Sequence, residues 1–367
     1  MYNDPVRIQH LALRPGRRIL VISDIHGNLD YFSGLLSQAV FTPADELIID
    51  GDFLEKGPQC LETLRFIMAL SQRGNVHPLR GNCDGWHTIF DHGEEGDAHL
   101  LHYLQWRKCG LLWEMFHSLG LDPMAMDNIT PHKAALHAFD AEFAYLGSLP
   151  DGIDTENFTF VHAGRQPDKP LEQHTRGELD RIDRFLDKGY AFDKWVIVGH
   201  YPVMLYGEDK VCANPIIERQ RKIVSIDGAC VLKDDGQLNA LIIPSKDSED
   251  FSFTAYDPFP ERRVLTDQAE SRRSYYIRWG DSQVQVLDRG PEFSRCRHVR
   301  TGYEMDILTK YLFTGEEFTD CNDCTDYILP LRPGDRVGLV EKTSRGFFVK
   351  HNGISGWYYG DLEQSYG

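Results

Sequence analysis

Six side chains of the kinds that bind divalent cations each follow a short apolar run of the sequence: Asp24, His26, Asp52, Asn82, His162 and His200. Carboxylate and amide oxygens, together with imidazole nitrogens, suit ions such as Mn²⁺, Fe²⁺ or Zn²⁺. Asp52 could bridge two such ions. Two ions about 3.5–4 Å apart can activate a water molecule and stabilise both ends of an in-line displacement at phosphorus. The six residues therefore predict a two-metal centre for phosphoryl hydrolysis.

The apolar runs before these residues predict the strands that bring them together. Each run has four or five mostly apolar residues, and they lie at 18–22, 46–49, 76–79, 158–161, 195–198 and 222–226. Such runs are typical of strands that are buried on both faces. Helical stretches between them, such as 29–39 and 60–72, predict an α/β or layered αββα core. Ligands bind such cores at the carboxyl ends of the strands, and the candidate ligands stand there.

The same stretches carry motifs that resemble a known family. They read Asp-Ile-His-Gly-Asn at 24–28, Gly-Asp-Phe-Leu-Glu-Lys-Gly at 51–57, Gly-Asn-Cys-Asp at 81–84, Val-His-Ala-Gly at 161–164 and Gly-His-Tyr-Pro at 199–202. Over about residues 17–245 the chain resembles calcineurin-like metallophosphoesterases, and among them the phosphoprotein phosphatase (PPP)-like branch. The resemblance implies a two-sheet αββα sandwich. It implies one metal on Asp24, His26 and Asp52, and a second on Asp52, Asn82, His162 and His200.

Three basic residues are candidates for binding the substrate phosphate. Arg80 stands two residues before Asn82, and the resemblance implies that it contacts the phosphate. A guanidinium group suits this task because it binds two oxygens at once; a surface salt bridge is the alternative role. Lys56 stands where the family has a second phosphate-binding Arg, and it supplies charge without that geometry. Arg165, directly after the motif at 161–164, is the third candidate.

Cys83 is the main departure from the family pattern. The phosphatases have a His there, held by the following acid (here Asp84), that protonates the leaving alkoxide. A thiol with a pKa of about 8.5 could donate a proton, so Cys83, Asp84 and Arg80 are the expected catalytic residues, with His87 as an alternative acid. A general acid contributes about 10²–10⁴-fold, and we expect poor leaving groups to need it most. The change therefore favours good leaving groups.

The preferred function is hydrolysis of phosphomonoesters by direct attack of a metal-bridging hydroxide. The enzyme would be a protein phosphatase that favours phosphotyrosine or other good leaving groups, and its partner a phosphorylated protein or phosphorylated small molecule. The first alternative is a nucleotide or dinucleoside polyphosphate hydrolase, or a phosphodiesterase. The second is an inactive metal-binding scaffold that docks a partner through its C-terminal region, which the departures at Cys83 and Lys56 motivate.

The 367 residues divide into three expected parts. Residues 1–245 form the metallophosphoesterase domain, within which 86–150 are a mostly helical cap insert. Residues 246–327 form a β-rich linker, in which 274–278 and 283–287 predict a β-hairpin. Residues 328–367 resemble a bacterial SH3-like barrel, because of the Pro-Gly-Asp at 333–335, Gly353 and the Gly-Trp-Tyr at 356–358. That resemblance implies a small all-β barrel with a peptide partner.

Composition limits the other classes of function. The 39 basic and 56 acidic residues give a formal net charge of −17, which argues against binding of nucleic acid or of an anionic membrane. The sequence has no run of 18 apolar residues, so we expect no membrane-spanning helix. Eight scattered cysteines are typical of reduced thiols rather than of a disulfide framework. We therefore expect a cytoplasmic protein.

Overall fold

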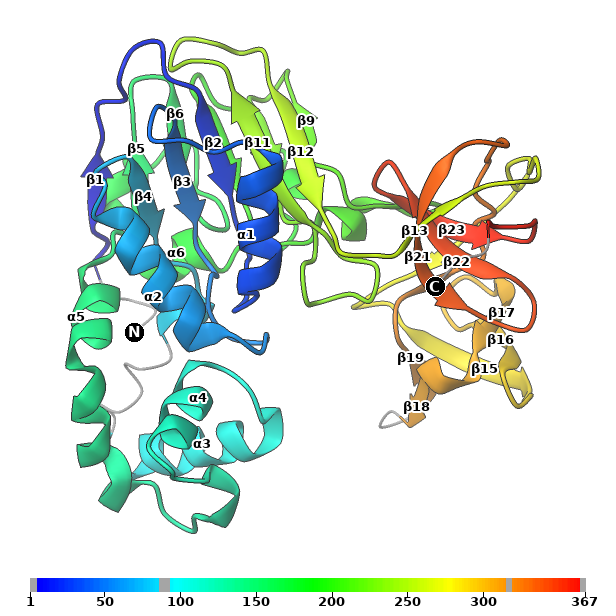
Figure 1. Cartoon of the computed structure of the whole chain (residues 1–367), viewed down its shortest axis with the longest axis horizontal. Coiled ribbons are helices and arrows are strands. Elements are labelled where there is room, and N and C mark those ends of the chain that lie inside the picture. Colours follow the sequence, from blue (N-terminus) through cyan, green and yellow to red (C-terminus); the bar gives the residue numbers. More distant parts are fainter. Residues whose placement is uncertain (1–4, 86–92, 315–318, 364–367) are drawn as a thin grey trace. The chain divides into compact units, whose positions relative to one another are not determined.

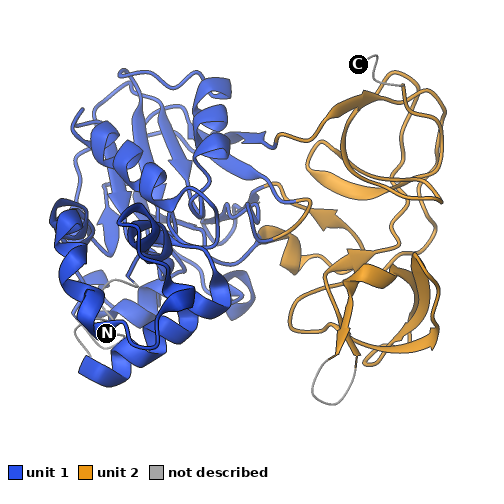
Figure 2. Cartoon of the chain, turned by 60° about the horizontal axis from the view of Figure 1, so that its bottom comes forward, with its two compact units in different colours: residues 1–202, 215–232, 236–257 blue, residues 203–214, 233–235, 258–367 orange. Residues whose placement is uncertain are grey.

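The computed structural model describes residues 5–85, 93–314 and 319–363, and it separates into two compact units (Figure 2). Unit 1 comprises residues 1–202, 215–232 and 236–257, and unit 2 comprises residues 203–214, 233–235 and 258–367. Residues 246–257, expected in the linker, belong to unit 1 because β12 (Ser252–Tyr256) pairs along its length with β11 (Leu238–Ile243). None of the helices in the described ranges is long and apolar enough to cross a lipid bilayer.

Two sheets form the centre of unit 1. The first has the order β1 (Ile8–His10), β5 (Gly152–Asp154), β6 (Phe158–Phe160), β7 (Trp195–Val198), β10 (Ile223–Ser225) and β9 (Ile216–Glu218). The second has the order β12, β11, β2 (Ile19–Ile22), β3 (Glu46–Asp50) and β4 (Val76–Leu79). In the second sheet β2, β3 and β4 run parallel, and in the first β6, β7 and β10 do. Each parallel set therefore has all its carboxyl ends at one edge.

Successive side chains of the second sheet fill two separate cores. Leu20 packs with the apolar residues of α1 (Leu29–Gln38) and α2 (Cys60–Ser71), whereas Val21 packs with residues of the first sheet such as Ile197. This division follows from the alternation of side chains along a strand. Helices thus cover one face of the second sheet and the first sheet covers the other. The expected mixed α/β fold with several sheets is confirmed.

Helices fill most of the described part of the insert. They are α3 (Gly93–Arg107), α4 (Leu111–Ser118), η2 (Pro123–Ala125), η3 (Thr130–Phe139) and α5 (Asp140–Ser148). Their buried apolar residues belong to the same core as those of α1 and α2. In Figure 1, α3 and α4 lie beyond the ends of β2 and β3 to which the arrows point. Three shorter helices follow: η4 (Leu171–Gln173), α6 (Arg176–Asp180) and η5 (Phe185–Lys188).

Unit 2 contains two five-stranded sheets, each with its own core. One has the order β13 (Glu261–Arg263), β21 (Arg336–Lys342), β22 (Phe347–His351), β23 (Ile354–Tyr358) and β8 (Val211–Cys212). The other has the order β17 (Glu304–Leu308), β16 (Phe293–His298), β15 (Gln283–Asp288), β19 (Thr319–Cys321) and β18 (Leu312–Thr314). The remaining elements are β14 (Tyr276–Ile277), β20 (Cys324–Thr325), η6 (Val203–Tyr206) and η7 (Thr309–Tyr311).

The predicted hairpin at 274–287 is wrong. A turn is present, with a bridge between Arg278 and Asp281, but β14 pairs with β20 and β15 pairs with β16 and β19. The two strands therefore enter different sheets. The sheet of β21–β23 also takes in β13 and β8, which precede residue 328. No strand pairing among the described residues closes this sheet into a barrel, so the likeness to an SH3 domain stays a prediction.

Candidate metal centre

The fold brings the six predicted ligands to the carboxyl ends of parallel strands. Asp24 and His26 follow β2, Asp52 follows β3, Asn82 follows β4, His162 follows β6 and His200 follows β7. The runs that end at these residues are buried strands, as their apolar composition requires. The chemistry-bearing residues therefore sit in the loops just beyond the buried strands.

Asp52 belongs to a first group of potential ligands with two histidines. Ligand atoms of Asp52, His162 and His200 all lie within 4.8 Å of one another. Asp52 Oδ1 is 3.3 Å from His162 Nε2, and Asn82 Oδ1 is 3.2 Å from the same nitrogen. Two oxygens and two imidazole groups thus converge on one position, as the donor set of a divalent cation does.

Asp52 also belongs to a second group. Its members are His26, Asp52 and Cys83, whose ligand atoms again lie within 4.8 Å of one another. His26 Nε2 is 3.8 Å from Asp24 Oδ1. Asp52 is therefore common to both groups, which is the position that a bridging carboxylate would need. The sequence pattern did not predict the sulfur of Cys83 among these donors.

Four of the six predicted ligands have a strained backbone. Asp24, His26, Asp52 and His200 have φ angles of 55°, 50°, 47° and 66°, in the left-handed region that costs a residue other than glycine about 1–3 kcal/mol. Local hydrogen bonds hold these conformations. Asp24 N donates to Gly51 O at 3.1 Å, His26 N to Asp52 O at 2.9 Å and His200 N to Asp24 Oδ2 at 3.0 Å. Such strain is typical of functional sites.

Gly81 lets the loop after β4 lie directly against Asp52. A Cβ at this position would collide with both Oδ1 and the backbone nitrogen of Asp52. Two residues later, Cys83 N donates to the same Oδ1 at 2.7 Å. The carboxylate of Asp52 is thus fixed by the loop that carries Asn82, and only glycine fits at the contact.

Two histidines have tautomers that leave Nε2 available as a ligand. His26 Nδ1 bonds the carbonyl of Leu54 at 3.2 Å, and His162 Nδ1 bonds the carbonyl of Asp50 at 2.9 Å. A carbonyl only accepts, so each Nδ1 carries a proton, and Nε2 is the ring nitrogen that can bind a cation in its deprotonated form. Hydrogen bonds of this kind orient metal-binding histidines. His26 Nε2 also lies 3.4 Å from Lys56 Nζ.

His200 presents its other ring nitrogen. Its Nε2 lies 3.3 Å from Asp183 Oδ1, which leaves Nδ1 facing Asn82. The amide of Asn82 has two orientations with different partners. In one, Oδ1 faces the imidazole nitrogens; in the other, Nδ2 donates to His200 Nδ1 at 2.7 Å, to His162 Nε2 at 3.2 Å and to Asp180 O at 3.1 Å. The first orientation offers an oxygen to a cation, whereas the second turns the NH₂ group toward the histidines.

Several buried carboxylates around the cluster have oxygens without a hydrogen-bond partner among the described residues: Asp24 Oδ1, Asp180 Oδ1, Asp227 Oδ2 and both oxygens of Asp50. Burial raises the pKa of Asp50 to about 7 and those of Asp180 and Asp227 to about 6, and burial together with Asp227 raises the pKa of Asp24. An ionised carboxylate in this setting needs a compensating charge. The residues present therefore fit divalent cations.

Asp52 and His162 behave as an ion pair in the protein alone. Burial opposes charge on both groups, but their mutual attraction lowers the pKa of Asp52 well below its ordinary value and raises that of His162 well above it. A cation that binds His162 Nε2 must replace the proton there, so binding releases a proton.

Lys56 alone among the three phosphate candidates has a described contact with the cluster, through His26. The insert holds its loop: Glu55 Oε1 accepts from Leu111 N and Glu55 Oε2 from Tyr103 OH, both at 3.0 Å, and Cys109 Sγ donates to Lys56 O at 3.6 Å. Burial lowers the pKa of Lys56, but the acidic groups around it, first the Cys83 thiol and then Asp52, raise this pKa by more than burial lowers it, so the net change is upward. Lys56 is therefore a cation at the cluster.

Arg80 and Arg165 make other contacts. Arg80 is buried, and its guanidinium pairs with Asp151, whose Oδ1 also accepts from Arg176 Nε at 3.1 Å. This pair anchors the start of the loop that carries Asn82. Arg165 donates to the carbonyls of two neighbouring loop residues and stacks over an aromatic ring, and no described contact joins it to the predicted ligands.

Asp84 and Cys83 do not form a described hydrogen-bonded acid pair. Asp84 accepts from Leu54 N at 3.0 Å and from Gly81 N at 2.8 Å, so it ties two loops together. Burial, followed by the charge of Asp52, raises the pKa of the Cys83 thiol. His87, the alternative acid, lies outside the described residues.

Two further acids belong to the site. Asp183, which bonds His200, stands in an irregular segment that carries no sequence signal. Asp227 follows the strand at 222–226 and is followed by glycine, so the pattern that marked the other ligands was present there. Both contribute negative charge near the predicted ligands.

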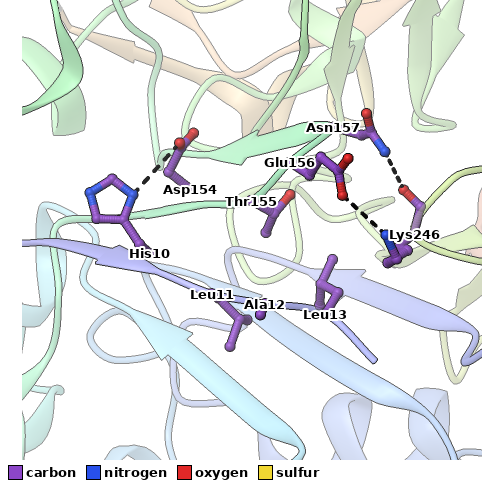
Figure 3. Close-up of a pocket in the computed structure, with 9 residues that line it drawn as sticks. All are labelled: His10, Leu11, Ala12, Leu13, Asp154, Thr155, Glu156, Asn157 and Lys246. Carbon is purple, nitrogen blue, oxygen red and sulfur yellow. Dashed lines mark hydrogen bonds and ion pairs between the residues drawn. The ribbon is translucent and has the colours of Figure 1, made fainter. Parts of the chain in front are cut away.

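A cavity of about 410 Å³ lies at the other edge of the sheets (Figure 3). It is lined by the segments 10–13 and 154–157 and by Lys246. Residues 154–157 directly precede β6, and Lys246 follows β11, whose end pairs with the first residue of β2. The cavity is therefore at the amino ends of the strands, away from the predicted ligands.

Residues 17–227, more than half of the chain, match the family model for the calcineurin-like phosphoesterases. The chain belongs to this family. This is the family that the motifs at the strand ends resemble. The matched segment contains all six predicted ligands.

Similar proteins include two curated tetraphosphatases. The chain is 45% identical over 65 residues to the symmetrical bis(5'-nucleosyl)-tetraphosphatase of Photobacterium profundum, a stretch that covers 17% of the chain and 23% of that relative. It is 25% identical over 264 residues to the asymmetrical bis(5'-nucleosyl)-tetraphosphatase PrpE of Bacillus subtilis, covering 66% of the chain and 97% of PrpE. A solved metallophosphoesterase from Sphaerobacter thermophilus aligns over 66% of the chain and 89% of its own length, at 19% identity and a TM-score of 0.39.

Proposed function

We propose that the chain is a metal-dependent hydrolase that cleaves phosphoanhydride bonds of nucleotides, with a bis(5'-nucleosyl) tetraphosphate as the first substrate to test. The observation that carries the proposal is the meeting of the six predicted ligands around Asp52. Two curated relatives are named as hydrolases of this substrate class, and one of them aligns along 97% of its length.

The chain's own residues have separate tasks in this proposal. Divalent ions bound at the cluster would lower the pKa of a coordinated water and neutralise phosphoryl oxygens. Lys56, held by the insert, adds positive charge at the cluster for the substrate phosphate. Asp183 holds the ring of His200, and the ion pair of Arg80 with Asp151 holds the loop of Asn82.

The leaving group supports an anhydride substrate. The chain has no imidazole at position 83, where the resemblance places the proton donor. The carboxylate of Asp84 accepts hydrogen bonds from two backbone amides. A leaving nucleotide phosphate is stable as an anion and needs little protonation, whereas a serine alkoxide depends on it. Replacing the usual acid thus favours anhydrides and aryl phosphates over alkyl phosphates.

A protein phosphatase of the PPP-like branch that favours phosphotyrosine is the second candidate. Gly199–Pro202 ends in Tyr-Pro, as in that branch, rather than in the second His that phosphodiesterases carry. The SH3-like region would then supply peptide binding. Within it, Tyr358 is fully buried and Trp357 nearly so, whereas Tyr359 is exposed, which makes Tyr359 the aromatic residue to test in such a role.

One experiment separates these functions. The full chain, loaded with Mn²⁺, Fe²⁺ or Zn²⁺, is assayed on bis(5'-adenosyl) tetraphosphate and on phosphotyrosine and phosphoserine peptides, with Asp52→Asn as the inactive control. We expect hydrolysis of the tetraphosphate, slower hydrolysis of phosphotyrosine and loss of both in Asp52→Asn. Preference for the peptides would establish the second candidate. Metal binding without hydrolysis of any phosphate would leave the inactive scaffold.

A further inference from the structure

We propose that Cys83 is a metal ligand, so that the site shared by His26 and Asp52 offers a sulfur donor beside an imidazole and a carboxylate. The inference rests on the proposed two-metal centre and specifies its chemistry. It replaces the role expected for Cys83 as a proton donor.

The positions of the donor atoms are the main support. Cys83 Sγ, His26 Nε2 or Nδ1 and an oxygen of Asp52 lie within 4.8 Å of one another, and all three residues are buried. The hydrogen bond from Cys83 N to Asp52 Oδ1, at 2.7 Å, fixes the sulfur-bearing residue against the carboxylate. Nδ1 of His26 is bonded to Leu54 O, so Nε2 is the nitrogen available to a cation.

An independent observation is the unpartnered oxygen of Asp24. This residue is 1% exposed, its Oδ1 has no hydrogen-bond partner among the described residues, and the oxygen is 3.8 Å from His26 Nε2. With Asp24 the group has one nitrogen, one sulfur and two carboxylate donors. Four donors of these kinds are sufficient for a tetrahedral ion.

Asn82 supports the same assignment. When its Oδ1 faces His162, its Nδ2 donates to Cys83 Sγ at 3.2 Å. A thiolate is a better acceptor of this hydrogen bond than a thiol. One orientation of the amide therefore serves both metal positions, because it gives oxygen to one and a hydrogen bond to the sulfur of the other.

The two positions would then differ in metal preference. Sulfur favours Zn²⁺, Fe²⁺ or Co²⁺ over Mn²⁺ and Mg²⁺, whereas the position with Asn82, His162 and His200 has only oxygen and nitrogen donors. Formation of the sulfur–metal bond breaks the S–H bond and releases the proton to solvent, without any change of oxidation state. Lys56 Nζ, 3.4 Å from His26 Nε2, must move aside.

Cobalt spectroscopy tests the inference without an activity assay. The full chain is freed of metal with a chelator and titrated with Co²⁺, and near-ultraviolet sulfur-to-cobalt charge-transfer absorption is recorded. We expect this band to saturate at one sulfur-bound ion per chain, to disappear in Cys83→Ala and Cys83→Ser and to persist in Cys109→Ser. Cys109 is the matched control because its thiol contacts the Lys56 loop but lies outside the ligand group.

Two other outcomes are distinguishable. Binding of Co²⁺ to wild type without the band would overturn the role of Cys83 and leave the phosphoesterase proposal standing, whereas no binding at all would overturn both. Because the Cys83 variants can fail to fold, X-ray absorption of zinc-loaded wild type provides a second measurement. A sulfur shell at about 2.3 Å is expected, and a shell of nitrogen and oxygen alone would refute the inference.

Discussion

Replacing Glu55 by Gln should stabilise the protein at neutral and alkaline pH but not at acid pH. Glu55 is 3% exposed, and burial raises its pKa from 4.5 to about 7. The folded chain therefore binds a proton in a range where the unfolded chain has released it. The contribution of protonated Glu55 to the free energy of unfolding is fully present below pH 4.5. It is lost as the pH rises from 4.5 to about 7, and above that range no more is lost. Glutamine cannot ionise, and its amide can still bond Leu111 N and Tyr103 OH.

The size of this effect follows from the shift. The difference of 2.5 pKa units between 4.5 and about 7 corresponds to about 3 kcal/mol at 1.36 kcal/mol per unit. Glu55→Gln should thus match wild type near pH 4 and exceed it by about 3 kcal/mol at pH 8, with most of the gain between pH 5 and 7.

Urea unfolding of the metal-free protein, followed by circular dichroism at several pH values, measures this difference. Glu62→Gln is the matched control, since it removes a carboxylate that is exposed on α2, and it should not reproduce the gain of Glu55→Gln. The titration of other acidic residues contributes equally to the unfolding free energies of wild type and variant, so it cancels in the difference between them. A constant difference between Glu55→Gln and wild type from pH 4 to 8 would refute the reasoning.

Three further substitutions test how the site is held. Arg80→Ala should lower the free energy of urea unfolding by about 1.5–3 kcal/mol, because it removes one of the two arginines that pair with the buried carboxylate of Asp151 and leaves only Arg176; a higher KM at unchanged stability would instead indicate phosphate binding. Gly81→Ala should weaken Co²⁺ binding by on the order of ten-fold or more, measured by calorimetry, because the added methyl group displaces Asp52; unchanged affinity would contradict the collision. Asp183→Asn should weaken metal binding about ten-fold by loosening His200, and equal affinity would show that the ring needs no support.

The candidate ligands could be found from sequence because each follows a buried strand. The strand at 19–22 is apolar at every position, so its end is marked by the first polar residues, and Asp24 and His26 are among them. Parallel pairing of neighbouring strands then places their ends at one edge. The sheet order itself was not needed for this step, because all the relevant strands share a direction within their sheets.

Other features depend on contacts between distant residues. Arg80 is 71 residues from Asp151, and nothing near Arg80 distinguishes a buried ion pair from a phosphate contact. Likewise the turn after Ile277 is real, but Tyr276 pairs with Thr325, so turn residues alone predicted the wrong partner. Neither case could be decided by local periodicity, because the competing choices have the same local pattern.

The position of β8 limits how the gene could be shortened. The chain leaves unit 1 at Pro202, two residues beyond His200, and the next twelve residues belong to unit 2. There Cys212 is paired with Ile354 of β23. A polypeptide cut at residue 257 would keep β8 but lose the strand that pairs with it, a few residues after the predicted ligand His200. We expect such a product to be recovered in inclusion bodies, because the unpaired edge of β8 would be free to associate with other chains.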